Sequence, residues 1–141
     1  MNMAGITIDQ SARDNGLAAM IRDLITQNIV NHPERAKDLN ALKGNIGISA
    51  GDIEVSLTLQ CKEGNVVIYD GIQQPCKLLI ATDSDNILKL STLKIKAGLP
   101  YYFDKTGREI VGMLFTGKLR IQGLFAHLLL LTHVTKLFSV Y

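Results

Sequence analysis

The most informative segment of this sequence reads Phe115-Thr116-Gly117-Lys118-Leu119-Arg120-Ile121-Gln122-Gly123. Its two glycines bracket an alternating run in which Leu119 and Ile121 face one way and the polar side chains face the other. Such alternation is typical of a β-strand with one buried and one solvated face. An apolar segment from about Leu124 to Phe138 follows directly and predicts a helix that folds back over an assembled core.

Four more strands are predicted upstream, after the pattern changes from helical to alternating at Gly44. They cover residues 45–49, 52–60, 66–69 and 77–81. In the clearest of them, Leu57 and Leu59 belong to the buried face and Thr58 to the solvated face. Because short connections usually join neighbouring antiparallel strands, these strands predict a meander. With the late strand at 118–122, the sequence predicts a five-stranded, mainly antiparallel sheet.

Helical spacing surrounds and interrupts this sheet. An N-terminal helical segment spans residues 9–42, a short helix starts at Asp83 or Ser84, and further helical turns precede Gly117. Helices placed before, within and after an antiparallel sheet indicate an α+β fold with helices on one face. The length of 141 residues fits one domain, 1–141, in which the sheet and late helices occupy residues 44–140.

The composition favours a folded chain with a large apolar interior. Hydrophobic residues make up 47% and charged residues 20% of the chain, and the mean hydropathy is +0.16. No apolar run reaches the roughly 18 residues that a membrane-spanning helix needs. Residues 1–10 show no secretory signal, so we expect a cytoplasmic protein with Cys61 and Cys76 reduced.

Charge is distributed unevenly along the chain. Residues 1–93 hold 8 Lys and Arg against 11 Asp and Glu, a net −3, whereas residues 94–141 hold 7 against 2, a net +5. The basic C-terminal third favours transient contact with anionic lipid head groups. It lacks the dense basic patch with interleaved aromatic residues that binds nucleic acid, so no nucleic-acid partner is expected.

The sequence offers no recognisable catalytic or metal-binding motif. On a helix the direction of His133 is rotated from that of His127 by about 240°, so the two side chains do not converge on one zinc ion. Asp83 and Asp85 are explained by helix capping. Dinucleotide, phosphate-loop and nucleophile-elbow motifs are absent, and no set of nucleophile, base and orienting group can be assembled. We therefore expect neither an enzyme nor a resident cofactor or metal.

The segment 115–123 resembles the sterol carrier protein 2 family, in which a Phe-x-Gly-Lys-Leu-x-Ile-x-Gly stretch forms the last strand before the final helix. The order of the earlier elements is similar as well, and the resemblance spans roughly residues 17–140. The segment 93–111 departs from the family by its length. The resemblance implies non-catalytic binding and transfer of apolar lipids (a sterol, fatty acid, acyl-CoA or phospholipid) in a hydrophobic tunnel between sheet and helices.

Such a tunnel would be lined where the late helices meet the sheet. The interpretation assigns lipid contact to Ile87, Leu90, Met113, Leu114, Phe115, Leu119, Ile121, Phe125, Leu128, Leu129 and Leu131. Phe115 and Phe125, which bracket the strand, are the first candidates for ligand contact.

Two other functions remain open. The chain could be an accessory module that presents lipophilic intermediates, such as isoprenoid quinones, to a partner enzyme of lipid metabolism; exposure of residues 101–103 would support such a partner. A small thioesterase-like hydrolase acting on acyl-CoA is disfavoured, because that fold wraps its sheet around one long central helix and requires a placed carboxylate.

Overall fold

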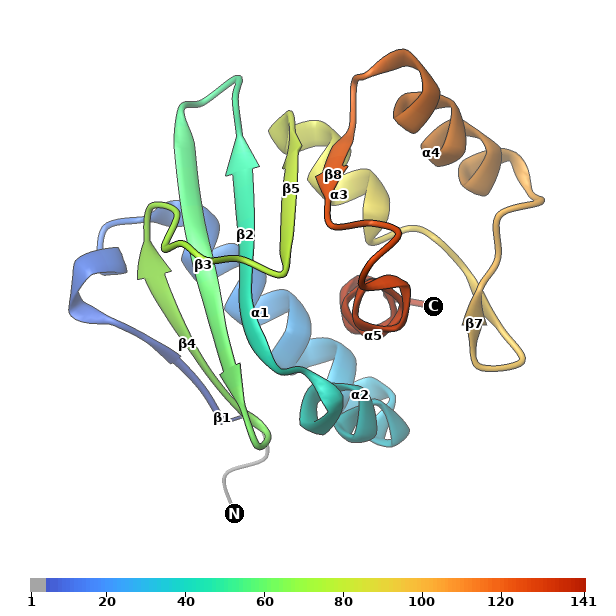
Figure 1. Cartoon of the computed structure of the whole chain (residues 1–141). Coiled ribbons are helices and arrows are strands. Elements are labelled where there is room, and N and C mark those ends of the chain that lie inside the picture. Colours follow the sequence, from blue (N-terminus) through green and yellow to red (C-terminus); the bar gives the residue numbers. More distant parts are fainter. Residues whose placement is uncertain (1–4) are drawn as a thin grey trace.

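The computed structural model describes residues 5–141 and confirms the α+β class (Figure 1). Residues 1–4, which belong to the segment examined for a secretory signal, lie outside the described range. Within that range the α-helices are α1 (Gly16–Asn31), α2 (Ala36–Ala41), α3 (Ser84–Leu90), α4 (Lys105–Thr116) and α5 (Leu128–Phe138). Short 3-10 helices precede the first two of these, at Gln10–Ala12 and Pro33–Arg35.

The main sheet of the described residues has six strands and is mixed, so the prediction of five mainly antiparallel strands is wrong in both respects. The strands lie in the order β1 (Gly5–Ile8), β4 (Asn65–Asp70), β3 (Val55–Lys62), β2 (Gly44–Ala50), β5 (Leu78–Thr82) and β8 (Arg120–Gln122). The strands β2, β3 and β4 form the expected meander. The unpredicted β1 is parallel to β4, and β5 is parallel to β2.

The connection between β4 and β5 explains why the meander stops after three strands. It spans residues 71–77 and crosses in front of β3 and β2, so that β5 joins the far side of β2 (Figure 1). The three interstrand steps from β4 to β5 amount to roughly 14 Å. Seven extended residues can reach about 23 Å, so this connection is long enough to pass over two strands. The sequence pattern does not distinguish this route from a hairpin.

This crossing segment also covers the sheet face opposite α1. Thr58, predicted on a solvated face, is fully buried beneath the crossing segment. Its hydroxyl donates to the Gly71 carbonyl and accepts from the Gln73 amide, each at 2.8 Å. A Cβ at Gly47 would lie 3.1 Å from the Ile72 side chain, so the absence of a side chain there allows close packing. The middle of the sheet is therefore covered on both faces.

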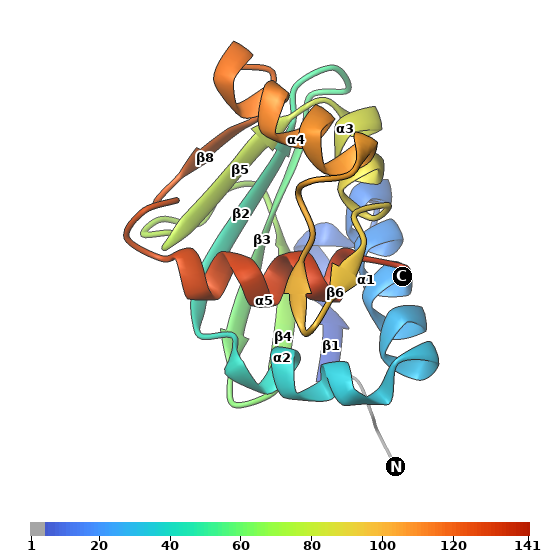
Figure 2. The same cartoon turned by 90° about the vertical axis from the view of Figure 1, so that its right-hand side faces the viewer.

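The core lies between the sheet and the helices α1, α2 and α5, and α5 packs against α1 and α2 (Figures 1 and 2). Buried polar groups fix this packing. The Asn28 side chain of α1 donates to the Leu137 carbonyl of α5 at 2.9 Å. The buried Arg35 guanidinium donates to the backbone oxygens of Ser139 and Tyr141. The C-terminal segment is thus held by side chains from the N-terminal helical segment.

The elements after β5 differ in detail from the expectation. Residues 93–111 form a small hairpin, β6 (Ile95–Lys96) and β7 (Leu99–Pro100), and then enter α4. The predicted helix from Leu124 is wrong at its start, because residues 124–127 form a turn before α5. Gly123 has a positive φ of 85° and lies against the Lys77 carbonyl, so the chain turns there before the helix begins.

Candidate functional site

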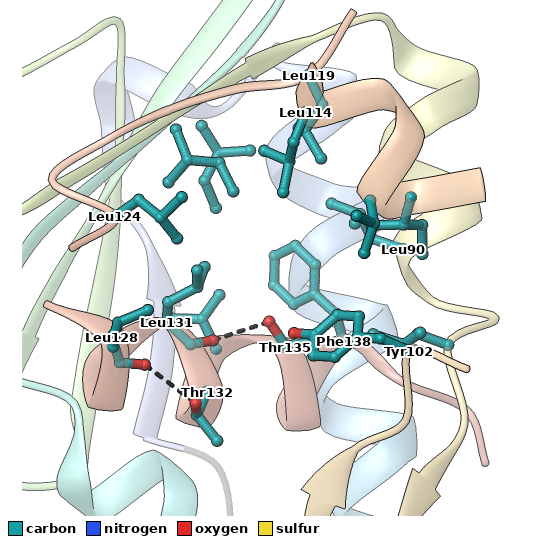
Figure 3. A pocket seen from close by; sticks show the side chains of 16 residues that line it. Leu90, Tyr102, Leu114, Leu119, Leu124, Leu128, Leu131, Thr132, Thr135 and Phe138 are labelled. Carbon is teal, nitrogen blue, oxygen red and sulfur yellow. Dashed lines mark hydrogen bonds between the residues drawn. The ribbon is translucent and has the colours of Figure 1, made fainter. Parts of the chain in front are cut away.

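A cavity of about 330 Å³ lies among α3, α4, α5 and the last two strands of the sheet, β5 and β8 (Figure 3). Its volume is at the lower end of the range for small-molecule pockets, about 300–1,000 Å³. We call it the α4–α5 cavity. The side chains that line it are Ile80, Leu90, Leu93, Tyr102, Ile110, Val111, Leu114, Leu119, Ile121, Leu124, Leu128, Leu131, Thr132, Val134, Thr135 and Phe138.

The walls of the α4–α5 cavity are apolar and carry no acidic, basic or imidazole side chain among the described lining residues. Only Tyr102, Thr132 and Thr135 contribute side-chain polar atoms. The Thr132 hydroxyl donates to the Leu128 carbonyl at 3.0 Å, and the Thr135 hydroxyl donates to the Leu131 carbonyl at 2.8 Å (Figure 3). Such a surface binds its occupant mainly through the removal of apolar groups from water, worth about 0.8 kcal/mol per methylene.

The helix α4 forms the upper wall of the cavity. Its first turn is capped by the Asp104 carboxylate, which accepts from the Gly107 amide at 2.7 Å. Lys89 of α3 and Glu109 of α4 form an ion pair at 2.8 Å that ties the two helices together on their exposed sides. This pairing holds the pKa of the Glu109 carboxyl below its usual value. The apolar side of α4 is therefore turned toward α5 and the strands β5 and β8.

The helix α5 forms the lower wall with a mainly apolar face. Leu128, Leu131, Thr135 and Phe138 follow the spacing of one helical face and line the cavity. Leu137, on another side, is fully buried in the core. One helix thus serves the packed core and the cavity at the same time.

The structure separates the eleven predicted lipid-contact residues into three groups. Six line the α4–α5 cavity: Leu90, Leu114, Leu119, Ile121, Leu128 and Leu131.

Two others, Ile87 and Met113, are buried in the core and do not line the cavity. Phe115, Phe125 and Leu129 do not line it and are 87%, 87% and 72% exposed. The two phenylalanines chosen as first candidates therefore lie outside the cavity that the structure forms.

Several lining residues were missed for different reasons. Thr132 and Thr135 lie on the same helical face as Leu128 and Leu131, so strict use of the helical period would have found them. Ile80 belongs to a correctly predicted strand, but the pairing of that strand with β8 was not predicted. Tyr102 comes from an irregular segment after β7, and no local pattern indicates that it reaches the cavity.

Ionisable groups gather elsewhere in the molecule. The buried Asp38 carboxylate lies 2.8 Å from His133 Nδ1 and 3.1 Å from Lys136 Nζ, on the side of α5 that faces α2. His133 thus contacts Asp38 of α2 and does not act together with His127. Within residues 5–141 no group of three or more His, Cys, Asp and Glu side chains is arranged to hold a metal ion.

The two cysteines are free thiols among the described residues. Burial raises the pKa of the Cys61 thiol to about 12, and burial also raises the pKa of Cys76. Neither lines the α4–α5 cavity. Among the helices of the described residues, none has the length and apolar character needed to cross a membrane.

Comparison with solved structures finds a similar fold. A structure titled "UbiJ-SCP2 Ubiquinone synthesis protein" matches this chain with a TM-score of 0.57 and 15% sequence identity, over 85% of this chain and 90% of that chain. At this identity the likeness concerns the fold alone, and it agrees with the sterol carrier protein 2 type of fold indicated by residues 115–123. No protein-family model and no curated protein sequence matches the chain.

Proposed function

We propose that this chain is a non-catalytic lipid-binding domain that holds the apolar part of a lipid in the α4–α5 cavity and transfers it between membranes. The uncharged, apolar lining of the cavity is the observation that supports this proposal most directly. Among the described residues, the lining offers no nucleophile–base pair and no carboxylate that could act on a bound ester. Shielding and release of an apolar molecule is the function that such walls support.

Mass spectrometry of the intact protein under native conditions tests whether a lipid is bound. We expect the purified protein to release an apolar molecule on solvent extraction. Leu131→Asp places a charge in the cavity wall and should abolish the bound mass, whereas Leu129→Asp, two residues away on an exposed side of α5, should retain it. Leu124→Asp, which alters the wall from a turn, repeats the test without changing a helix. Equal retention by all variants would refute lipid binding in this cavity.

Membrane contact during transfer is supported by the exposed side chains beside the cavity. Phe115, Phe125 and Leu129 are all more than two thirds exposed. Residues 110–141 contain Lys118, Arg120 and a further lysine but no acidic residue. Aromatic and basic side chains together suit the interface of an anionic membrane.

Transfer to vesicles containing phosphatidylserine tests this contact. We expect the double variant Phe115→Ser/Phe125→Ser to slow the transfer of a bound lipid without weakening its binding in the absence of vesicles. Phe103→Ser is the control, because Phe103 is 78% exposed but belongs to the segment that leads into α4. Equal transfer rates for the double variant and for Phe103→Ser would contradict a membrane role for Phe115 and Phe125.

A second candidate function is the presentation of a lipophilic intermediate to a partner enzyme. Two observations favour it: the structural neighbour is titled a ubiquinone synthesis protein, and Leu99 and Phe103 are 60% and 78% exposed on one segment. In that case a stoichiometric enzyme should co-purify with the native chain and be lost with Phe103→Ser. A free carrier should co-purify with lipid and no such enzyme.

A further inference from the structure

The polar atoms of the α4–α5 cavity are few and consist of three hydroxyl groups. The threonine hydroxyls at 132 and 135 already donate their protons to carbonyls of α5, so their oxygens can only accept from an occupant. Tyr102 points its hydroxyl toward α5 across the cavity, and none of the hydrogen bonds drawn among the lining residues reaches it (Figure 3). The cavity therefore presents one uncommitted hydroxyl donor.

Tyr102 remains protonated in this setting. Burial raises the pKa of its phenol, because an apolar environment disfavours the charged phenolate. The residue is 37% exposed, so it lies at the edge of the cavity. A neutral phenol there can donate to a carbonyl, ether or hydroxyl oxygen of an occupant, and it offers no countercharge to a carboxylate or phosphate.

An ionised group inside these walls would be poorly solvated. Removing an unpaired charge from water costs several kcal/mol even after relaxation of the protein, and the lining holds no cation to offset that cost. A neutral oxygen, by contrast, loses one water contact and gains one hydrogen bond from Tyr102. The walls thus favour an uncharged occupant over an ionised one with the same hydrocarbon chain.

Resting on the proposed lipid binding, we propose that the ligand of the α4–α5 cavity is an uncharged lipid with a neutral oxygen group that accepts a hydrogen bond from Tyr102. Tyr102 is then the residue that determines specificity for the polar group. At about 30 Å³ per small group, the volume of 330 Å³ accommodates about ten such groups. Probes with about ten carbon atoms therefore fit the site, and longer chains extend beyond it.

Three probes of similar size separate these effects in equilibrium dialysis of the whole chain at pH 8. Decan-1-ol is neutral with one oxygen, hexylbenzene is a hydrocarbon, and decanoate is ionised at this pH. We expect decan-1-ol and hexylbenzene to bind and decanoate to bind at least about tenfold more weakly than decan-1-ol. Tyr102→Phe should weaken decan-1-ol about fivefold, the effect of one net hydrogen bond, and leave hexylbenzene unchanged.

Tyr101→Phe is the matched control. The neighbouring Tyr101 packs edge to face on Phe103 at 5.8 Å and does not line the cavity, so all three affinities should stay the same. Two results would overturn the inference while lipid binding stands. One is that decanoate binds as tightly as decan-1-ol. The other is that Tyr102→Phe weakens neither decan-1-ol nor hexylbenzene, or weakens both equally. Failure of both decan-1-ol and hexylbenzene to bind would instead overturn the proposed function itself.

Discussion

Filling the α4–α5 cavity with larger side chains should raise the stability of the protein and weaken its binding of an apolar ligand. Leu114 and Leu131 face the space from α4 and α5, and replacing both with phenylalanine adds ring atoms where no protein atoms lie (Figure 3). If each ring buries about one methylene equivalent more apolar surface than leucine, the pair adds ~1.6 kcal/mol to the free energy of unfolding. A close-packed region would instead lose about 1–3 kcal/mol per enlarged side chain through overpacking.

Binding should change in the opposite direction. If the two rings displace two methylenes of an occupant, the loss of ~1.6 kcal/mol weakens binding about fifteenfold. Urea unfolding measures stability, and equilibrium dialysis of decan-1-ol measures binding. Leu57→Phe is the control, because Leu57 is fully buried in β3 and should lose stability on enlargement. Destabilisation of Leu114→Phe/Leu131→Phe to the same degree as Leu57→Phe would refute the existence of usable space between the two helices.

Other expectations concern the framework that supports the cavity. Arg35→Ala should cost about 3 kcal/mol in urea unfolding, since it leaves the buried Ser139 carbonyl and the partly buried Tyr141 oxygen without their donor, whereas loss of the exposed ion pair in Arg22→Ala should cost less than about 0.5 kcal/mol. Asn15→Ala should cost about 2 kcal/mol, because it removes the cap of α1 and a hydrogen bond to β3; a change within 0.5 kcal/mol would contradict this role. Because burial raises the pKa of the Cys61 thiol to about 12, iodoacetamide should modify the less buried Cys76 first in the folded protein, and faster labelling of Cys61 would show that β3 is not buried as described.

The local pattern of the sequence predicts the elements better than it predicts how they pair. Alternation in residues 52–60 places Leu57 and Leu59 on a buried face, which the structure confirms. The same alternation places Thr58 in solvent, and this is wrong because the 71–77 connection covers it. A crossing segment is held by contacts distant in sequence, and a period of two in one strand contains no information about them.

The cavity was predictable only where helix and strand periods define a face. Leu119 and Ile121 alternate within the last strand, and Leu128 and Leu131 follow one helical face, so these lining residues could be identified. Phe115 was misplaced because it lies at the end of α4, where its side chain is 87% exposed, and the direction of that helix relative to the sheet depends on tertiary packing. The late helices were identified as a region, but their orientation was not.

The two walls of the cavity should differ in mobility, because different interactions hold them. The helix α5 is fixed by the buried bonds from Asn28 and Arg35, whereas the only side-chain polar link between α4 and α3 among the described residues is the Lys89–Glu109 pair, whose side chains are 40% and 41% exposed. A surface pair of this kind contributes about 0–1 kcal/mol, so α4 should open at a lower free energy than α5. We expect the amides of α4 to exchange with deuterium before those of α1 and the second half of α5, and bound decan-1-ol to slow exchange mainly in α4. Equal protection of the α4 and α1 amides from exchange in the absence of ligand would contradict the assignment of α4 as the more mobile wall. The occupant would then have to enter past a wall other than α4.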